Sequence, residues 1–521
     1  MNTFKRKALT CAVLAGLGAT SAEAVVLNAV DNTGQVLIYP YYTVQTAGGN
    51  VFNTYMSITN TTSVAKVLKV RFREGKTSAE VLDFNLYLSP NDMWVGAIVA
   101  DGSGTDSPAR LAFSTDLSCT DPAIPTGGEP FKNFAYLASP DSLPGTTLDR
   151  TREGYIEVFE MAVLSGVAAA NVTHPLAGGA PPNCAAMRSP DGLTQPAPLT
   201  GNMQTPNGGL YGNATLINVA NGADYGYVAD ALDMYAFDSY YAGVGSPLPT
   251  LGGAQASPNS LRLLAQLNPL NNSTLDNFAI ASNFAALSGA TAGARAVASV
   301  YMHSAVMNDY VLDSGTLSNT DWVLTFPVKR EFVTAVTAIN PFTAVMTTAG
   351  ACEPALFNIF NRDEASITPP SAGFSPQAPA GAPGVGNLCW ESTVVSFRNT
   401  AAHTTASGTN SGVLGSRNSV SVPVPQNFQN GWASATFTGA NATTALTGGL
   451  ISAASTTLSQ FQAAPLATAA RTFVGLPVTG FMVRTITNNA VDCTRGTTLV
   501  TGGCQGNYGS LFRHAYRNLV R

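Results

Sequence analysis

The chain has 521 residues, a formal net charge of −5 and a charged fraction of 11%. This length is enough for two or three domains, and the charged fraction is less than half of the roughly 25% that is usual for soluble domains. The acidic balance excludes the basic surface that nucleic-acid binding requires, and so few charges give weak repulsion between neighbouring molecules.

The N-terminus is typical of a secretory signal peptide. Lys5, Arg6 and Lys7 precede an apolar run of about 13 residues, and the small-x-small sequence Ala22-Glu23-Ala24 follows. The run is shorter than the roughly 20 residues that a membrane anchor needs. We predict that residues 1–24 are a signal peptide and that the mature chain has no transmembrane segment. It is then exported to the cell surface or the extracellular space, with the periplasm as the alternative.

The cysteines agree with export. Six of the seven lie after the predicted leader, and an even number in an exported chain indicates disulfides. Counting leaves the connectivity open, but we expect sequential pairing because each link then closes a loop rich in Gly, Pro, Thr or Ala: Cys119–Cys184, Cys352–Cys389 and Cys493–Cys504. No CxxC pair occurs and the four histidines have no ligand spacing, so we predict neither structural zinc nor another cofactor.

Residues 25–164 are expected to form a β-sandwich. Val36–Tyr42 is apolar and aromatic but contains Pro40, which cannot donate to a sheet ladder, so this strand lies at an edge or carries a bulge. Further strand-like stretches follow between turn sequences, at 52–60, 66–74, 82–88 and 93–100. Short strands with regular turns are typical of sandwiches, including immunoglobulin-like ones.

Charged residues alternate along two of these strands. Lys69, Arg71 and Arg73 share one face, and a turn near residues 76–77 places Arg71 opposite Asp83. An opposite-charge pair across strands contributes about 0.2–1 kcal/mol. We interpret this face as a solvated ladder of ion pairs, with an ion-binding site as the alternative.

Three carboxylates lie on or beside a predicted strand at 155–163. Alternation places Glu153 and Glu157 on one face and Glu160 on the other. Two carboxylates about 5–9 Å apart could serve a glycosidase, but a wet strand face is the simpler interpretation. The sequence has no nucleophile elbow, zinc-protease helix, Walker loop or dinucleotide fingerprint. We therefore predict no catalytic residues and no enzyme.

The turn at residues 101–106 is a weak calcium candidate. Asp101, Ser103 and Asp106 could supply oxygen ligands, but the turn lacks the spacing and the bidentate Glu of an EF-hand loop. Acidic turns rich in Gly and Ser are common, so we predict no metal site here.

Clustered tyrosines are the candidate contacts for a ligand or partner. They are Tyr39, Tyr41 and Tyr42, and further along the chain Tyr240 and Tyr241. Exposed aromatic rings stack on sugars or anchor protein partners. The alternative role is packing along an edge strand with a wet hydroxyl.

The rest of the chain divides into two parts. Residues 165–295 are rich in Ala, Gly, Pro and Asn, and we expect long loops with short helices at 260–267 and 276–287. Residues 296–521 form a second β-rich region, with candidate strands at Ala296–His303, Trp322–Val328, Ala355–Phe360, Ser392–Phe397, Trp432–Phe437 and Phe481–Ile486. The predicted fold class is mainly β, with two sandwich regions, long Ala/Gly/Pro-rich loops and a few short helices.

Several short motifs resemble one protein group. They are Tyr39-Pro40-Tyr41-Tyr42, Phe72-Arg73-Glu74-Gly75, Val81-Leu82-Asp83-Phe84-Asn85 with Leu88-Ser89-Pro90, Thr320-Asp321-Trp322 and Tyr508-Gly509-Ser510-Leu511-Phe512. With these motifs the chain resembles uncharacterised exported bacterial proteins described as cell-surface or hypothetical proteins. The resemblance covers both ends and little of the middle. No activity is established for that group, so it implies no site residues and favours a surface location.

These features lead to three functional hypotheses. The first is a non-enzymatic cell-surface or extracellular structural protein that associates with itself or with other surface components. The alternative is an extracellular glycan- or peptide-binding module, and the third is a glycoside-active enzyme. Unpaired strand edges are templates for pairing between chains, so the Pro40 strand and the strand near Phe481 are the candidate association surfaces.

Overall fold

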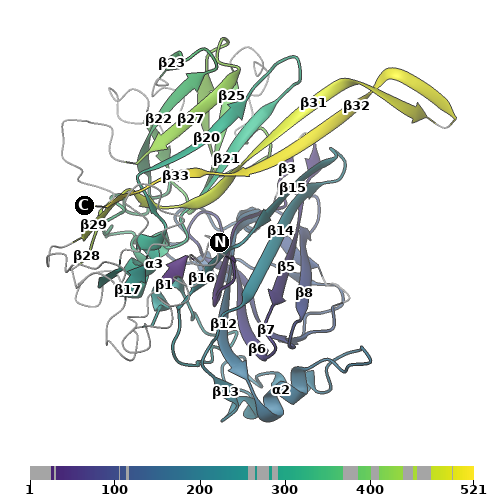
Figure 1. The fold of residues 1–521 in the computed structure, drawn as a ribbon, viewed down its shortest axis with the longest axis vertical. Helices are drawn as coiled ribbons and strands as arrows, with labels where there is room; N and C mark the ends of the chain where they lie inside the picture. The colour runs from purple at the N-terminus through teal and green to yellow at the C-terminus, as the bar shows by residue number, and fades with distance from the viewer. Residues whose placement is uncertain are drawn as a thin grey trace, which may run out of the picture.

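The structure is a computed structural model. It describes residues 25–27, 31–47, 49–104, 106–112, 116–255, 264–266, 281–283, 292–367, 385–399, 410–437, 450–453, 471–495 and 497–520. The predicted leader, residues 1–24, lies outside the described residues. Two β units are stacked along the long axis of the molecule (Figure 1), and the mainly β fold class is confirmed.

The N-terminal unit consists of two sheets that face each other across an apolar core. The larger sheet has ten strands in the order β10 (Cys119–Asp121), β7 (Glu80–Leu88), β6 (Ala65–Glu74), β12 (Glu153–Leu164), β2 (Val36–Thr43), β16 (Asp230–Asp233), β1 (Val25–Leu27), β17 (Leu264–Gln266) and β18 (Ala281–Asn283), with β13 (Met203–Gln204) beside β12. The smaller sheet has the order β11 (Glu129–Pro130), β9 (Ala109–Ala112), β8 (Met93–Ala100), β5 (Asn53–Asn60), β14 (Leu210–Asn218) and β15 (Ala223–Val228). Val70 and Ile156 of the larger sheet and Trp94 of the smaller one meet in this core.

The C-terminal unit also pairs two sheets. One has the order β23 (Ser366–Ile367), β22 (Glu353–Asn361), β27 (Asn430–Thr436), β20 (Ala305–Val311) and β33 (Ala515–Arg517), with β24 (Val385–Leu388) beside β22. The other has the order β26 (Ser419–Val424), β25 (Ser392–Asn399), β21 (Asn319–Thr325), β31 (Thr479–Arg495) and β32 (Thr498–Arg513). Phe357 of the first sheet and Trp322 of the second share its core.

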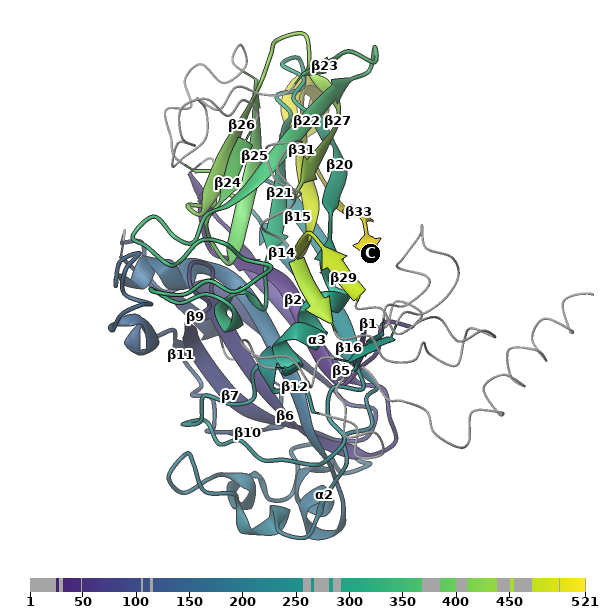
Figure 2. The same ribbon diagram turned by 90° about the vertical axis from the view of Figure 1, so that its left-hand side faces the viewer.

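Shorter elements connect these layers. The short strands are β3 (Thr46–Ala47) with β4 (Asn50–Val51), β19 (Met302–His303) with β30 (Leu476–Pro477), and β28 (Leu450–Ala453), β29 (Arg471–Val474) and β34 (Leu519–Val520). The α-helices are α2 (Gly166–Val172) and α3 (Ala292–Val300), and single 3₁₀ turns lie at Phe134–Tyr136, Leu148–Arg152, Cys184–Met187, Ala197–Leu199, Leu251–Gly253 and Lys329–Glu331. Helix α2 lies at the end of the N-terminal unit remote from the C-terminal unit (Figure 2). None of the helices within the described ranges has the length and apolar character that a membrane crossing requires.

The middle segment contributes more strand than the sequence predicted. Residues 165–295 include β14, β15 and β16, which complete both sheets of the N-terminal unit. The described parts of the two predicted helices, within 260–267 and 276–287, are the short strands β17 and β18. The predicted strand at Ala296–His303 is mostly helix α3, because its small residues allow the helix to be buried from 293 to 300 among larger side chains.

The Pro40 strand is bulged and interior. Strand β2 pairs with β12 on one side and β16 on the other, and the register with β12 shifts between Gly154 and Ile156, opposite Tyr42 and Tyr39. The bulge places Pro40 where no ladder donor is needed, so this alternative of the sequence interpretation is confirmed. The use of this strand as an association edge is wrong, because both edges are occupied within the chain.

All three sequential disulfides are present. Cys119 pairs with Cys184, Cys352 with Cys389 and Cys493 with Cys504, which confirms the predicted pairing. Three disulfides indicate that the protein matures in an oxidising compartment outside the cytoplasm.

Candidate functional site

The first predicted tyrosine cluster lies inside the protein. Tyr39, Tyr41 and Tyr42 have no exposed surface. Their hydroxyls donate to the Ser57 carbonyl, the Glu153 carboxylate and the Thr151 carbonyl at 2.6, 2.7 and 3.0 Å. The prediction that these rings contact a ligand or partner is therefore wrong. The reason is that β2 is an interior strand with both faces covered.

Tyr240 and Tyr241 belong to a segment that covers the outer face of the larger sheet. We call residues 234–255 the covering segment. The Tyr240 hydroxyl donates to the Glu160 carbonyl at 3.2 Å, and the Tyr241 hydroxyl lies 3.4 Å from the Asp121 carboxylate. Both side chains are half-buried. These contacts attach the covering segment to the sheet, so both tyrosines have a structural role here.

The covering segment also buries the charged strand face. Arg71 is opposite Asp83, as the sequence predicted, but the ion pairs join Lys69 to Asp83 and Arg71 to Glu80. The backbone of the segment caps the cations: Lys69 donates to the Gly243 carbonyl at 2.9 Å and Arg71 to the Pro247 carbonyl at 2.8 Å. The interpretation as a solvated ladder is wrong, because a distant segment lies over it.

The three carboxylates of β12 are also buried, and each has different partners. Glu157 pairs with Arg73 at 2.9 Å and Glu160 with Lys66 at 2.5 Å. Glu153 accepts hydrogen bonds from Tyr41 and from residues 416–418 of the C-terminal unit. Their burial contradicts the expected wet strand face. The structure does not bring them together into a pair of carboxylates facing a cavity.

The calcium candidates have protein partners. Asp101 pairs with Arg110 at 3.0 Å, and Asp106 accepts from the Leu148 amide at 2.7 Å. Ser103 is exposed. Within the ranges that the structure describes, no group of three or more His, Cys, Asp or Glu side chains is placed to hold a metal ion. The turn is thus tied to its neighbours by ordinary contacts.

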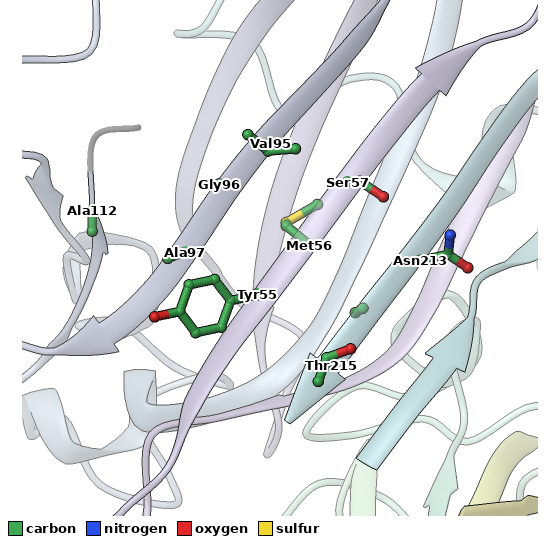
Figure 3. Close-up of a pocket in the computed structure, with 10 residues that line it drawn as sticks. Tyr55, Met56, Ser57, Val95, Gly96, Ala97, Ala112, Asn213 and Thr215 are labelled. Carbon is green, nitrogen blue, oxygen red and sulfur yellow. The ribbon is translucent and has the colours of Figure 1, made fainter. Parts of the chain in front are cut away.

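A shallow groove of about 440 Å³ crosses the outer face of the smaller sheet (Figure 3). Its walls come from β5, β8, β9 and β14, and none of its lining side chains carries a charge: Tyr55, Met56, Ser57, Val95, Gly96, Ala97, Ala112, Asn213, Ala214 and Thr215. The Tyr55 ring is 47% exposed and lies beside Ala97, while Asn213 and Thr215 project from the neighbouring strand. No sequence signal distinguishes this surface, because Tyr55 lies in a strand with ordinary alternation of apolar and polar residues.

The most unusual feature is a long hairpin formed by β31 and β32, which we call the arm. Pairing of β31 with β21 ends at Thr485, but the hairpin continues to residues 495 and 498 and projects beyond both units (Figure 1). A strand of 16 residues is roughly 50 Å long. The disulfide Cys493–Cys504 links the two strands near the tip.

The distal part of the arm is largely exposed, although Leu511 near its root packs against the N-terminal core. Between residues 484 and 513, Thr487 is the only buried side chain among those that the structure describes. Leu499, Tyr508 and Phe512 are 67%, 56% and 44% exposed. Hydrogen bonds support the arm midway: the Asn507 side-chain amide donates to the Asn221 carbonyl beside β15 at 2.6 Å, and the Thr487 backbone amide donates to the Thr316 carbonyl at 2.8 Å. The sequence predicted only the root of this strand, near Phe481, as an association surface.

A buried carboxyl occupies the junction of the two units. Glu391 lines a cavity of about 140 Å³ together with Thr77, Asp141 and Arg330, and no hydrogen bond of ordinary geometry from the described part of the chain reaches its oxygens. Burial raises the pKa of Glu391 to about 8, and the nearby cations Lys329 and Arg330 offset only part of this effect. The carboxyl is therefore mainly protonated at neutral pH. Sequence reasoning gave no signal for it.

Comparisons with protein-family models, curated proteins and solved structures found no match. The resemblance to exported surface proteins thus stays a prediction, and the function is argued from the surfaces themselves.

Proposed function

We propose that the protein is a non-enzymatic structural component of the cell surface or extracellular space, and that it associates with further copies of itself through the arm. The observation that carries this proposal is the position of the distal part of the arm, a covalently linked hairpin whose described side chains beyond Asn488 are not buried. The predicted signal peptide and the disulfides support the location.

The physical argument is that the arm is incomplete by itself. A two-stranded hairpin in water is marginally stable, and three or more strands or a packed face are needed for independent stability. Beyond Thr485, β31 pairs among the described strands only with β32, and β32 is the last strand of its sheet. Such strand edges are templates for β-augmentation by another chain. The disulfide keeps the two strands paired until a partner covers them.

The low charge density favours self-association over solubility as a monomer. The exposed side chains of the arm include Leu499, Tyr508 and Phe512, and Asp492 is the only acidic residue among 479–513. Like-charge repulsion between two arms is therefore small. An isologous contact, in which the same surface of both copies meets, is the commonest way to close a dimer.

The distal part of the arm can be deleted so that a favourable two-residue turn closes the remaining hairpin. Asn488 and Gly506 are direct partners across the arm, so removing residues 489–505 joins them as an Asn-Gly pair, the preferred two-residue hairpin turn. This shortens the arm, removes its disulfide and leaves the pairing with β21 intact. We expect the mature wild-type chain to form dimers or larger species at micromolar concentration in analytical ultracentrifugation, and the shortened variant to sediment as a folded monomer.

A point variant distinguishes association through the arm from non-specific association through any exposed apolar side chain. Leu499→Ser is expected to weaken association, while Leu176→Ser, at a fully exposed leucine outside the arm, leaves it unchanged. A wild-type chain that stays monomeric across the concentration range contradicts the proposal. So does a shortened variant that assembles as well as the wild type.

A peptide-binding module is the second candidate. The glycan- or peptide-binding hypothesis depended on two tyrosine clusters, of which Tyr39, Tyr41 and Tyr42 are buried and Tyr240 and Tyr241 attach the covering segment to the sheet. The groove beside Tyr55 is uncharged and mainly apolar, which suits the side chains of an extended peptide better than a charged ligand. A peptide array with the wild type and Tyr55→Ala tests it, with Tyr508→Ala on the arm as the control. Equal patterns for wild type and Tyr55→Ala would remove this candidate.

A further inference from the structure

A second cavity, of about 170 Å³ and open at one side, lies where the two units meet on the side of β16. Strand β16 contributes Asp230 from the N-terminal unit, and the C-terminal unit contributes Thr479, Arg513 and Tyr516. Further polar side chains in the wall are Tyr301 and His303, which follow helix α3, and Asn32 and His514. The cavity therefore draws its polar groups from both units. Thr479 and Arg513 lie at the root of the arm, and no lining residue belongs to its projecting part.

The charges in this cavity cancel. The Arg513 guanidinium pairs with the Asp230 carboxylate, and the Thr479 hydroxyl donates to the same carboxylate. Burial lowers the pKa of His303 and of His514 to about 4, so both imidazoles are neutral at physiological pH. A bound cation would face Arg513 and a bound anion would face Asp230. The balance favours a ligand without net charge.

The cavity contains a hydroxyl that is free to form a hydrogen bond with a ligand. Among the residues that the structure describes, the Tyr301 hydroxyl has no hydrogen-bond partner, although Tyr301 is only 1% exposed. Burial and the negative charge of Asp230 both raise the pKa of this phenol, which is consistent with a hydroxyl on the Asp230 side of the cavity. A buried hydroxyl without a partner costs about 1–3 kcal/mol of desolvation and calls for an explanation.

The histidine supplies the complementary group. His303 Nδ1 lies 2.5 Å from the Asn518 side-chain oxygen, which assigns the proton to Nδ1 and leaves Nε2 as an acceptor. The His303 ring stacks on Tyr516, with ring centroids 4.1 Å apart. Arg513, whose side chain is 62% exposed, lies at the mouth with further N–H donors. The cavity thus offers donors, an acceptor and an aromatic wall.

We propose that this cavity binds a neutral, hydroxyl-rich molecule the size of a single sugar ring. Its hydroxyls would accept from Tyr301 and Arg513 and donate to His303 Nε2, and its C–H face would lie against Tyr516. This proposal does not depend on association through the arm.

The test uses the mature full chain with glucose, galactose, N-acetylglucosamine and glycerol as probes in titration calorimetry. We expect saturable binding of at least one sugar and about tenfold weaker binding by Tyr301→Phe, the usual range for one lost hydrogen bond in a buried site. Tyr225→Phe is the matched control, because Tyr225 carries another buried hydroxyl without a partner, in the N-terminal core. It should bind as the wild type does.

Both variants delete a hydroxyl that makes no hydrogen bond, so neither is expected to impair folding, and thermal melting checks this. Binding of none of the four probes by the wild type would overturn the proposal. Wild-type affinity in folded Tyr301→Phe would overturn the proposal as well. The Tyr301 hydroxyl would then be a buried group that contacts no ligand, like the hydroxyl of Tyr225.

Discussion

Ser416 donates a hydrogen bond of 2.5 Å to Glu153, and this contact joins the two β units. The backbone amides of Arg417 and Asn418 donate to Oε1 of this carboxylate at 2.9 and 3.2 Å. The Tyr41 hydroxyl donates to Oε2, the oxygen that also accepts from Ser416, at 2.7 Å. A carboxylate that collects this many donors is a strong acceptor for a loop of another unit, because each bond is charge-assisted. Glu153, which was a catalytic candidate by residue type, instead fixes the relative position of the units.

Glu153→Gln should destabilise the protein by about 2–4 kcal/mol, because an amide turns an NH₂ group toward donors and leaves buried N–H groups without an acceptor. Urea unfolding followed by fluorescence and circular dichroism measures the change. We also expect the single transition to separate into two, since the units lose a main contact. Glu129→Gln, at a partly exposed carboxylate with one ion pair, is the control and should cost less than about 1 kcal/mol.

The strands were predictable where the information is local. Alternation and one turn predicted β6, β7 and even the Arg71–Asp83 register. What covers their charged face was not predictable, since the Gly243 carbonyl that binds Lys69 lies 174 residues further along the chain. The arm was missed for the opposite reason. The distal residues of the arm are not buried on either face, so their sequence shows no apolar periodicity. The residues that line the two cavities at the junction come from segments far apart in the chain, so no local sequence pattern marks them.

The burial of the ion pairs can be tested with Arg73 and Glu157, whose side chains are 7% and 3% exposed. Arg73→Leu leaves a buried carboxylate without its partner and should cost about 3–5 kcal/mol. The double variant Arg73→Leu/Glu157→Leu should recover most of this loss, because it leaves no buried charge without a partner. A solvated ladder would instead give single losses below about 1 kcal/mol and no recovery. Urea unfolding of the three variants decides between the two, with Arg110→Leu as the partly exposed control.

Glu391 should make the stability of the protein depend on pH. Its pKa is raised from 4.5 to about 8 by burial, so between these values the folded state binds a proton that the unfolded state has lost. Stability from this group is therefore complete at low pH and falls as the pH rises from about 5 to 8, at a limiting slope of about 1.4 kcal/mol per pH unit. Glu391→Gln stays neutral and should lose this fall.

The measurement is the difference in unfolding free energy between Glu391→Gln and the wild type across that range. Other titrating groups act in both proteins: His303 and His514, with pKa values lowered to about 4, make stability rise with pH below about 6.5. Taking the difference removes their contribution. Parallel curves for variant and wild type would contradict a protonated Glu391. Glu364→Gln, at an exposed carboxylate, should give parallel curves.

Two of the three disulfides should differ in what they stabilise, Cys119–Cys184 the body and Cys493–Cys504 only the arm. Cys119–Cys184 spans 65 residues and joins β10 to the turn at Cys184–Met187, so its removal should cost about 4 kcal/mol by the chain-entropy argument. Cys493–Cys504 spans 11 residues near the tip of the arm, where none of the described side chains is buried. Replacing this pair with serines should leave the urea midpoint of the body unchanged and increase hydrogen exchange in residues 486–506. It should also weaken association, since the partner must then order the hairpin itself. Equal loss of global stability in the two double-serine variants would mean that the arm folds cooperatively with the body, and the arm could then no longer be treated as an independent association element.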